Sequence, residues 1–433
     1  MDPSLPKGPM RPAGKRPLGL ELRACSFTHP VCVEPEAHRL VPAAMETLRA
    51  LELAYSRLTG ALDLPRPRLP RPGSGEGLLA LVEESLGETT VEVLPADLGL
   101  GVFDTSSAVC RIRPVRGMAL ERASSLCVGE AIALRLDPGM SPHLRRAYAT
   151  YLWWLTGSPT AKDWRGVAQF QETPHAAALG RERSRTSEGA ALFFEFFEGL
   201  SEGTGNGSTA TALVARAASS TPAESPQWHN EPDVVDVLRS TLDGTALPWP
   251  RLLGAFSRSR VLLGLPGYSR PGTLMLFDAA WSRPTFDWQL QASTLPRRLL
   301  VTGMEPTGST FLRLEIDAPF APGEAIAVSA ECEGPSPFVW EILKLQRDGR
   351  PHIVVPVAFR EHSRTVERTI SELQDTRVVL IAGTSAGGLG RALPFDPDIW
   401  PYEPRACAVS LARLTPASHR SRGGAPGTDV RAP

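Results

Sequence analysis

The sequence lacks both an excess of charge and a long apolar run. It contains 46 lysine and arginine residues against 47 aspartate and glutamate residues, which leaves a formal net charge of −1. A chain with so little net charge has no overall field that would attract nucleic acid or a membrane surface. No stretch reaches the roughly 18 consecutive apolar residues of a membrane-spanning helix. We therefore expect neither a nucleic-acid partner nor a transmembrane segment.

Lysine and asparagine are also scarce, with four and two occurrences. This bias towards arginine is typical of proteins from GC-rich bacterial genomes. The rest of the composition is ordinary for a globular protein, with 42% hydrophobic and 21% charged residues. A chain of 433 residues is long enough for two or three domains and a sizeable core.

No Cys-x-x-Cys pair occurs, which argues against a zinc ribbon. The cysteines are nevertheless even in number and spaced as three pairs. They are Cys25, Cys32, Cys110, Cys127, Cys332 and Cys407. This usage favours structural disulfides and an oxidising compartment. The alternative is a set of six reduced cysteines in the core.

An export signal is not visible at the N-terminus. Residues 1–24 contain basic residues and prolines but no apolar core of a signal peptide. The extracytoplasmic location that we predict, whether secreted, periplasmic or at the cell surface, therefore follows from cysteine usage alone. A wrongly assigned start codon would explain the missing signal.

Two domains are predicted between two disordered ends. Residues 1–24 are rich in proline, glycine and basic residues and are expected to be disordered. Residues 25–270 are predicted to form a mostly helical α+β domain. Apolar residues fall on one helical face from about Arg39 to Leu58. Strands are expected around residues 89–95 and 107–115, and further helices follow between residues 119 and 263. In one of these, Pro142 occupies the first helical position, where its missing N–H costs nothing.

The pattern changes after residue 270. Between residues 280 and 414, short runs alternate between apolar and polar residues, as in "FLRLEID", where Leu312, Leu314 and Ile316 share one face. About eight or nine such runs predict an antiparallel β-sandwich. Residues 415–433 are expected to form a disordered tail. The predicted fold class is therefore α+β, with a helical domain followed by a sandwich.

The stretch from Thr186 to Leu200, "TSEGAALFFEFFEGL", raises the question of a metal site. Many zinc peptidases present their third metal ligand from such a Glu-Gly-x-Ala helix. They also need two histidines one turn apart in an HExxH motif, whose glutamate activates the metal-bound water. None of the eight histidines lies four residues from another, so the motif is absent.

The order of the predicted elements resembles the secreted zinc metallopeptidases of GC-rich bacteria, in which a helical HExxH…EG domain precedes a β-sandwich. The resemblance covers residues 100–414 and includes the stretches "LLGAFSRSRVLLG" and "PFDPDIWPYEPRACAVSL". It implies that "RRAYATYLWWLTG" is the metal helix, and that a long loop containing Trp and Phe connects it to the Glu-Gly-x-Ala helix. Thr150 and Trp154 then occupy the histidine positions, Tyr151 occupies that of the general base, and Glu188 matches the third ligand.

These substitutions predict a degenerate relative that binds no cofactor, or a helical domain unrelated to peptidases. A glutamate in the first turn of a helix also favours the helix macrodipole without any metal, which is the simpler interpretation of Glu188. An unconventional zinc site built from His143, His175 and Glu188 is the alternative.

A second candidate motif is "GTSAG", which matches the G-x-S-x-G of serine hydrolases around Ser385. A nucleophile elbow must lead into a helix, but the following "GLGRALPFDPDIWP" is rich in glycine and proline. A loop between sandwich strands is therefore the preferred interpretation.

The preferred function is non-catalytic: an extracytoplasmic binding or surface protein, because no complete metal, triad or phosphate-binding motif is present. The alternatives are an active zinc-dependent peptidase and a sandwich that binds carbohydrate or protein. Binding sandwiches often expose aromatic side chains, and the candidates are Trp288, Trp340 and Trp400. The sequence identifies no particular partner.

Overall fold

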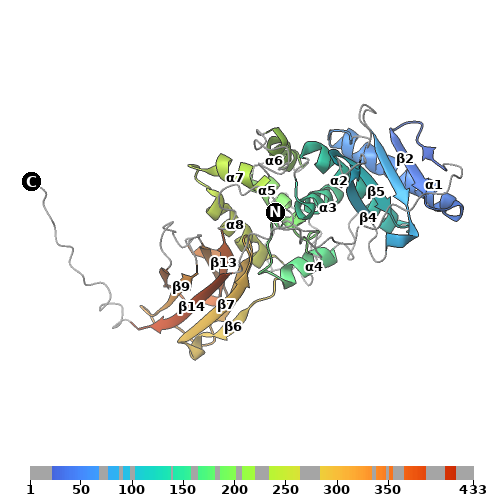
Figure 1. Ribbon diagram of the computed structural model, residues 1–433. Helices are drawn as coiled ribbons and strands as arrows, with labels where there is room; N and C mark the ends of the chain where they lie inside the picture. The colour runs from blue at the N-terminus through green and yellow to red at the C-terminus, as the bar shows by residue number, and fades with distance from the viewer. Residues whose placement is uncertain are drawn as a thin grey trace, which may run out of the picture.

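The structure is a computed structural model of the 433-residue chain. It describes residues 22–67, 77–86, 91–97, 103–137, 140–157, 164–180, 186–200, 207–219, 234–263, 283–333, 338–347, 351–354, 365–386 and 405–415. The fold is α+β, as predicted: helices dominate the N-terminal part and sheets the C-terminal part, which lies at the opposite end of the molecule (Figure 1). The expected disordered ends fall almost wholly outside the described residues.

A mixed five-stranded sheet begins the N-terminal domain, in the order β1-β2-β3-β5-β4. The pairs β2–β3 and β3–β5 are parallel and the two outer pairs are antiparallel. Helices α1 and α2 pack against it and against each other. The bounds are β1 Ala24–Cys25, β2 Val31–Pro35, η1 His38–Leu40, α1 Val41–Ser56, η2 Arg57–Ala61, β3 Leu78–Val82, η3 Glu84–Leu86, β4 Val91–Asp97, β5 Phe103–Ile112 and α2 Met118–Leu136.

Six further helices complete the described part of this domain. They are α3 Pro142–Thr156, α4 Trp164–Glu172, α5 Ala191–Leu200, α6 Ser208–Ser219, α7 Val234–Leu242 and α8 Trp249–Leu262. Helix α3 begins as the sequence indicates, with Pro142 in its first turn and the Ser141 hydroxyl accepting a hydrogen bond from the Leu144 N–H at 3.2 Å. Helix α4 was expected to be a loop, and its nine residues bury one apolar face.

The C-terminal domain contains two sheets that face each other across an apolar core. Their strand orders are β11-β10-β13-β8-β6 and β12-β9-β14-β7. All described pairs are antiparallel except the parallel pair β6–β8, which departs from the predicted pattern. The bounds are β6 Trp288–Gln291, η4 Ala292–Thr294, β7 Arg297–Met304, β8 Ser309–Glu315, β9 Ala325–Cys332, β10 Phe338–Gln346, β11 Pro351–Val354, β12 Thr365–Ile370, β13 Thr376–Ser385 and β14 Arg405–Leu414.

All six cysteines form disulfides, as predicted. Cys25–Cys32 joins β1 to β2, Cys110–Cys127 joins β5 to α2, and Cys332–Cys407 joins β9 to β14. Each bridge therefore links two elements of one domain. Among the described residues, no helix is both long enough and apolar enough to cross a membrane.

Helix α8 joins the two domains by packing on the outer face of the first sandwich sheet. Val261 and Leu262 share a buried apolar cluster with Phe311 of β8, Leu343 of β10 and Leu380 of β13. Both faces of β10 are therefore covered, which explains why its side chains are buried almost without alternation.

Arg260 of α8 also contributes to the junction between the helical part and the sandwich. Its side chain is completely buried there. Its Nε donates to Oε1 of Gln171 at 2.9 Å, and Nη2 donates to the carbonyl oxygen of Phe170 at 3.1 Å. The guanidinium carbon lies 4.0 Å from the ring centre of Phe170 and 5.3 Å from that of Phe311. Such cation–π contacts strengthen when they are desolvated, so Arg260 connects α4 to the sandwich.

A histidine–aspartate pair also crosses the junction. His175 Nε2 lies 2.9 Å from Oδ1 of Asp287, and Oδ2 of Asp287 accepts hydrogen bonds from the Thr310 hydroxyl at 2.6 Å and the Phe311 N–H at 3.0 Å. Burial raises the pKa of Asp287, but His175, Thr310 and the Phe311 N–H together leave it below its ordinary value. The ionised carboxylate is therefore stabilised in the folded state.

This pKa shift predicts an acid-sensitive junction. A depressed carboxyl pKa contributes stability above the ordinary value of 3.8, and that stability is lost as the pH falls through the lower folded-state pKa. Asp287→Asn is expected to flatten the fall of the urea midpoint below about pH 4, while Glu331→Gln, an exposed change on β9, leaves the wild-type profile. Identical acid profiles for wild type and Asp287→Asn contradict the prediction.

Candidate functional site

The helix that the resemblance assigns to the metal is part of the hydrophobic core. Trp153 and Trp154 of α3 are each 1% exposed. The ring of Trp154 packs at 5.6 Å from that of Trp164 on α4. The Thr150 hydroxyl donates to the carbonyl oxygen of Arg146 at 2.8 Å, within its own helix. The side chains at the HExxH positions therefore fill volume and offer no pair of nitrogen ligands.

Glu188 lies in the turn before α5, which begins only at Ala191. The expectation that it occupies the first turn of this helix is therefore wrong by a few residues. Its carboxylate forms an ion pair with Arg122 of α2 instead. This contact connects α2 to the start of α5 and accounts for the glutamate without a metal.

The two histidines of the alternative zinc site have different neighbours. His143 is buried: its Nε2 lies 3.2 Å from the carbonyl oxygen of Ala178, and its Nδ1 lies 3.0 Å from Oγ of Ser187. His175 pairs with Asp287 at the domain junction. Nowhere in the described part of the chain do three His, Cys, Asp or Glu side chains gather as metal ligands. These residues do not fit zinc.

In the described part of the chain, neither Ser187 nor Ser385 offers an exposed hydroxyl for nucleophilic catalysis. Ser187, beside His143, has no exposed surface. Ser385 is 1% exposed and lies at the end of β13, where its N–H donates to the carbonyl oxygen of Gly308 at 3.0 Å. It is therefore part of a strand end. Residues 387–404, which would follow an elbow, lie outside the described residues.

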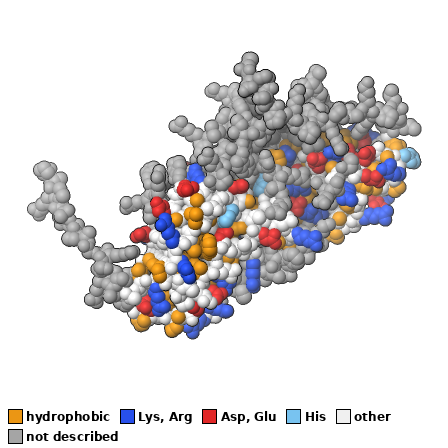
Figure 2. All heavy atoms as spheres, turned by 60° about the horizontal axis from the view of Figure 1, so that its bottom comes forward, with side chains coloured by type: hydrophobic (Ala, Val, Ile, Leu, Met, Phe, Trp, Pro, Cys, Tyr) orange, Lys and Arg blue, Asp and Glu red, His pale blue; other side chains and the backbone are white. Residues whose placement is uncertain are grey.

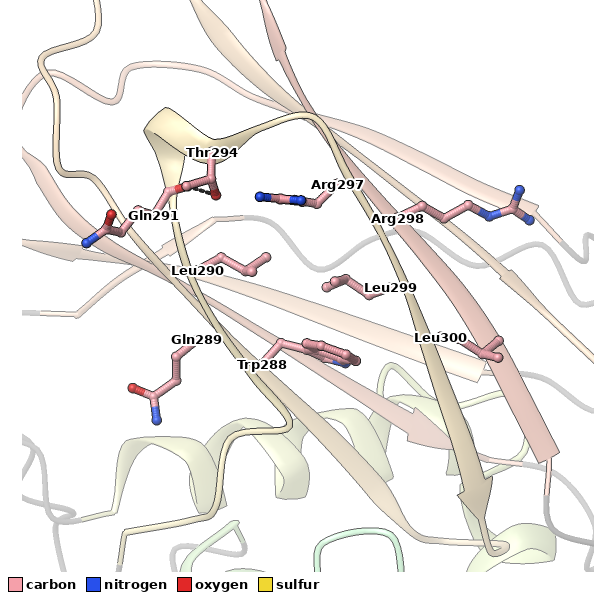
Figure 3. Close-up of a pocket in the computed structure, with 9 residues that line it drawn as sticks. All are labelled: Trp288, Gln289, Leu290, Gln291, Thr294, Arg297, Arg298, Leu299 and Leu300. Carbon is pink, nitrogen blue, oxygen red and sulfur yellow. Dashed lines mark hydrogen bonds between the residues drawn. The ribbon is translucent and has the colours of Figure 1, made fainter.

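An open groove lies at one edge of the sandwich, between β6 and β7. It has a volume of about 540 Å³. Its lining residues are Trp288, Gln289, Leu290, Gln291, Thr294, Arg297, Arg298, Leu299 and Leu300. Figure 3 shows Trp288 and Leu290 directed from β6 towards Leu299 of β7, whereas the Gln289 and Gln291 amides extend away from β7.

Strand alternation positions these side chains. On β7, Leu299 and Val301 are buried against the core, while Arg298 and Leu300 are exposed. Leu300 keeps 61% of its surface exposed and Trp288 keeps 37%, large values for apolar side chains. On the face turned forward in Figure 2, hydrophobic side chains gather beside basic ones at the sandwich end. The groove therefore combines an aromatic wall with an apolar floor.

The groove is also positively charged. Arg297 points into it near Thr294, whereas Arg298, which also contributes to the lining, points from β7 to the side away from β6 (Figure 3). Among the described residues, no carboxylate forms an ion pair with either guanidinium. A ligand with negative charge and an apolar face would complement this lining.

The short turn η4 lies at one end of the groove and is fixed by hydrogen bonds to Asp317. The N–H of Ser293 in η4 donates to Oδ1 of Asp317 at 3.0 Å, and the Ser293 hydroxyl donates to Oδ2. The hydroxyl, followed by the N–H, lowers the pKa of Asp317. The turn therefore positions Thr294 at the mouth independently of any ligand.

The sequence identified part of this site. Trp288 is exposed, as expected of a binding aromatic residue, but Trp340 is only 2% exposed and belongs to the core. Gly383 explains the position of Trp340, because a Cβ there would lie 2.4 Å from its ring. Trp400 lies outside the described residues. Arg297, Arg298 and Leu300 were not predicted, although "PRRLL" carries a signal in its paired arginines.

No protein-family model matches this chain, and no curated protein matches it. Among solved structures, it is similar to the pre-peptidase C-terminal domain of a collagenase from Bacillus anthracis. That match has 6% sequence identity and a TM-score of 0.20, and it covers 30% of this chain and 98% of that chain.

Proposed function

We propose that this protein is a non-catalytic, metallopeptidase-like binding protein of the extracytoplasmic space, and that the groove between β6 and β7 is its ligand site. The observation that carries the proposal is the exposure of Trp288 and Leu300 beside two arginines that lack carboxylate partners among the described residues. Exposed apolar side chains grouped with basic ones are typical of binding surfaces.

The non-catalytic part of the proposal rests on the donor set in the helical domain. Two tryptophans and a threonine stand in the helix assigned to the metal, and each is 1% exposed. Glu188, the remaining candidate ligand, has Arg122 as its partner. The active zinc peptidase is therefore the less favoured alternative.

The extracytoplasmic location is supported by the disulfides. Three of them, distributed over both domains, bring together every cysteine in the chain. Disulfides persist mainly in oxidising compartments.

The ligand site is tested by ¹⁹F NMR on protein labelled with 5-fluorotryptophan. We expect acidic peptides or acidic oligosaccharides to shift the Trp288 resonance, which is assigned by its loss in Trp288→Phe. The resonance of Trp340, buried in the same domain, is the internal control. Trp288→Ala is expected to weaken binding about tenfold or more. Ligands that shift other resonances but never that of Trp288 would place the site elsewhere.

Metal content tests the non-catalytic assignment. Protein purified without a histidine tag is expected to contain no stoichiometric zinc by elemental mass spectrometry, because its described residues offer no set of zinc ligands. Glu188→Ala is expected to give the same result. One zinc per chain in the wild type, lost in Glu188→Ala, would instead establish an active site around this residue, and peptidase assays would follow.

A further inference from the structure

Among the described residues, the two sandwich sheets differ in strand number, and the groove lies between their edge strands β6 and β7. The first sheet has five strands and ends at β6, whereas the second has four and ends at β7. Strand β6 contributes Trp288, Gln289, Leu290 and Gln291 to the groove, and β7 contributes Arg297, Arg298, Leu299 and Leu300. In the part of the chain that the structure describes, no strand pairs with the outer edge of β7.

An edge strand presents a row of backbone N–H and C=O groups that can accept another strand. The side chains of β7 alternate, with Leu299 facing the core and Arg298 and Leu300 facing outwards. A strand added beside β7 would continue this alternation. Its inward side chains would lie opposite Trp288 and Leu290, and its outward side chains would lie beside Arg298 (Figure 3).

We propose that the outer edge of β7 binds an extended segment of another polypeptide as an additional strand, with apolar side chains facing Trp288 and carboxylates beside Arg298. This inference rests on the proposed function and specifies its ligand class. The backbone supplies affinity, and the alternating pockets supply specificity, as in other cases of strand addition.

The charge of β7 favours a segment of another polypeptide over a second copy of this chain as the added strand. Strand β7 begins with two adjacent arginines, so the same strand of a second copy would bring further positive charge. Charged residues at a sheet edge are a common means of preventing such self-pairing. A partner strand with carboxylates would instead neutralise them.

An oligosaccharide would use the groove differently. It could stack on Trp288 and place acidic groups near Arg297, but it has no row of alternating backbone donors and acceptors to pair with β7. The contribution of the peptide backbone therefore distinguishes the two ligand classes.

The test uses the full chain and a fluorescent peptide of alternating valine and glutamate, eight residues long like β7. Fluorescence anisotropy measures its binding. We expect about tenfold or greater losses of affinity for Trp288→Ala, for Arg298→Glu, and for a peptide with the same side chains in which every amide is N-methylated. The matched control is Arg368→Glu, an exposed arginine on β12 at the opposite edge of the same sheet, which should bind like the wild type.

Three outcomes overturn the inference. Equal affinity for the N-methylated peptide would exclude strand addition. An equal loss for Arg368→Glu would indicate unspecific charge attraction. Binding of oligogalacturonate but not of the valine–glutamate peptide, with dependence on Trp288, would reject the peptide while supporting the groove as a ligand site. If Trp288→Ala changes the binding of neither probe, the proposed function itself fails.

Discussion

Glu130→Ala is expected to lower the free energy of unfolding by about 3–5 kcal/mol. Glu130 lies on α2 with 1% of its surface exposed. Its Oε1 lies 2.7 Å from Nε of Arg146, and its Oε2 lies 3.6 Å from Nε of Arg145, both on α3. Removing the carboxylate takes this counter-charge away from two buried guanidinium groups, and the hydrogen bond from Arg146 Nη2 to the Val91 carbonyl oxygen compensates only in part.

Urea unfolding followed by circular dichroism measures this effect. The matched control is Glu84→Ala, which removes the carboxylate partner of Arg39 at the exposed surface. Exposed ion pairs are screened by water, so the control should unfold at the wild-type urea concentration. Equal midpoints for Glu130→Ala and Glu84→Ala would show that the α2–α3 ion pairs do not stabilise the domain.

Trp154→Ala is expected to destabilise the protein by about 3–5 kcal/mol, because it removes a large side chain from a packed core and leaves a cavity. Trp154 is 1% exposed and contacts the ring of Trp164. The result bears on the proposed function, because the interpretation of α3 as a degenerate metal helix places a histidine position at Trp154. Replacing this buried tryptophan by a metal-binding histidine would therefore lower the stability of the folded protein.

Trp288→Ala provides the matched comparison. Trp288 is 37% exposed at the sandwich edge, so its removal should change the stability by less than about 1 kcal/mol while weakening ligand binding. Thermal unfolding and anisotropy on the two variants separate the roles. A large loss of stability in Trp288→Ala, or none in Trp154→Ala, would contradict the assignment of one tryptophan to the core and the other to the site.

Most of the helices could be predicted because their signals are local. The apolar stripe of α1 and the Ser141–Pro142 start of α3 lie within a few turns of the chain. Helix α4 was missed because nine residues between irregular segments offer only two turns of periodicity. Strands β2 and β3 were missed because each has five residues and pairs in parallel with segments far along the chain.

The candidate site was predicted only in part, for a related reason. Trp288 and Trp340 both occur in strands of the sandwich, and nothing in their immediate surroundings separates the exposed residue from the buried one. Trp340 is buried because β10 lies inside its sheet, between β11 and β13. Trp288 is exposed because β6 is at the edge.

Local sequence patterns thus account for the α+β class, the succession of a helical domain and a sandwich, and the absence of an HExxH motif. Periodicity, turn residues and motif spacing involve neighbours in the chain, so they can be interpreted without a structure. The groove, the Glu188–Arg122 pair and the junction built around Arg260 depend on contacts between distant segments. In particular, β6 and β7 are edge strands of the described sheets because of the way the strands pair, and strand pairing is set by contacts between distant segments.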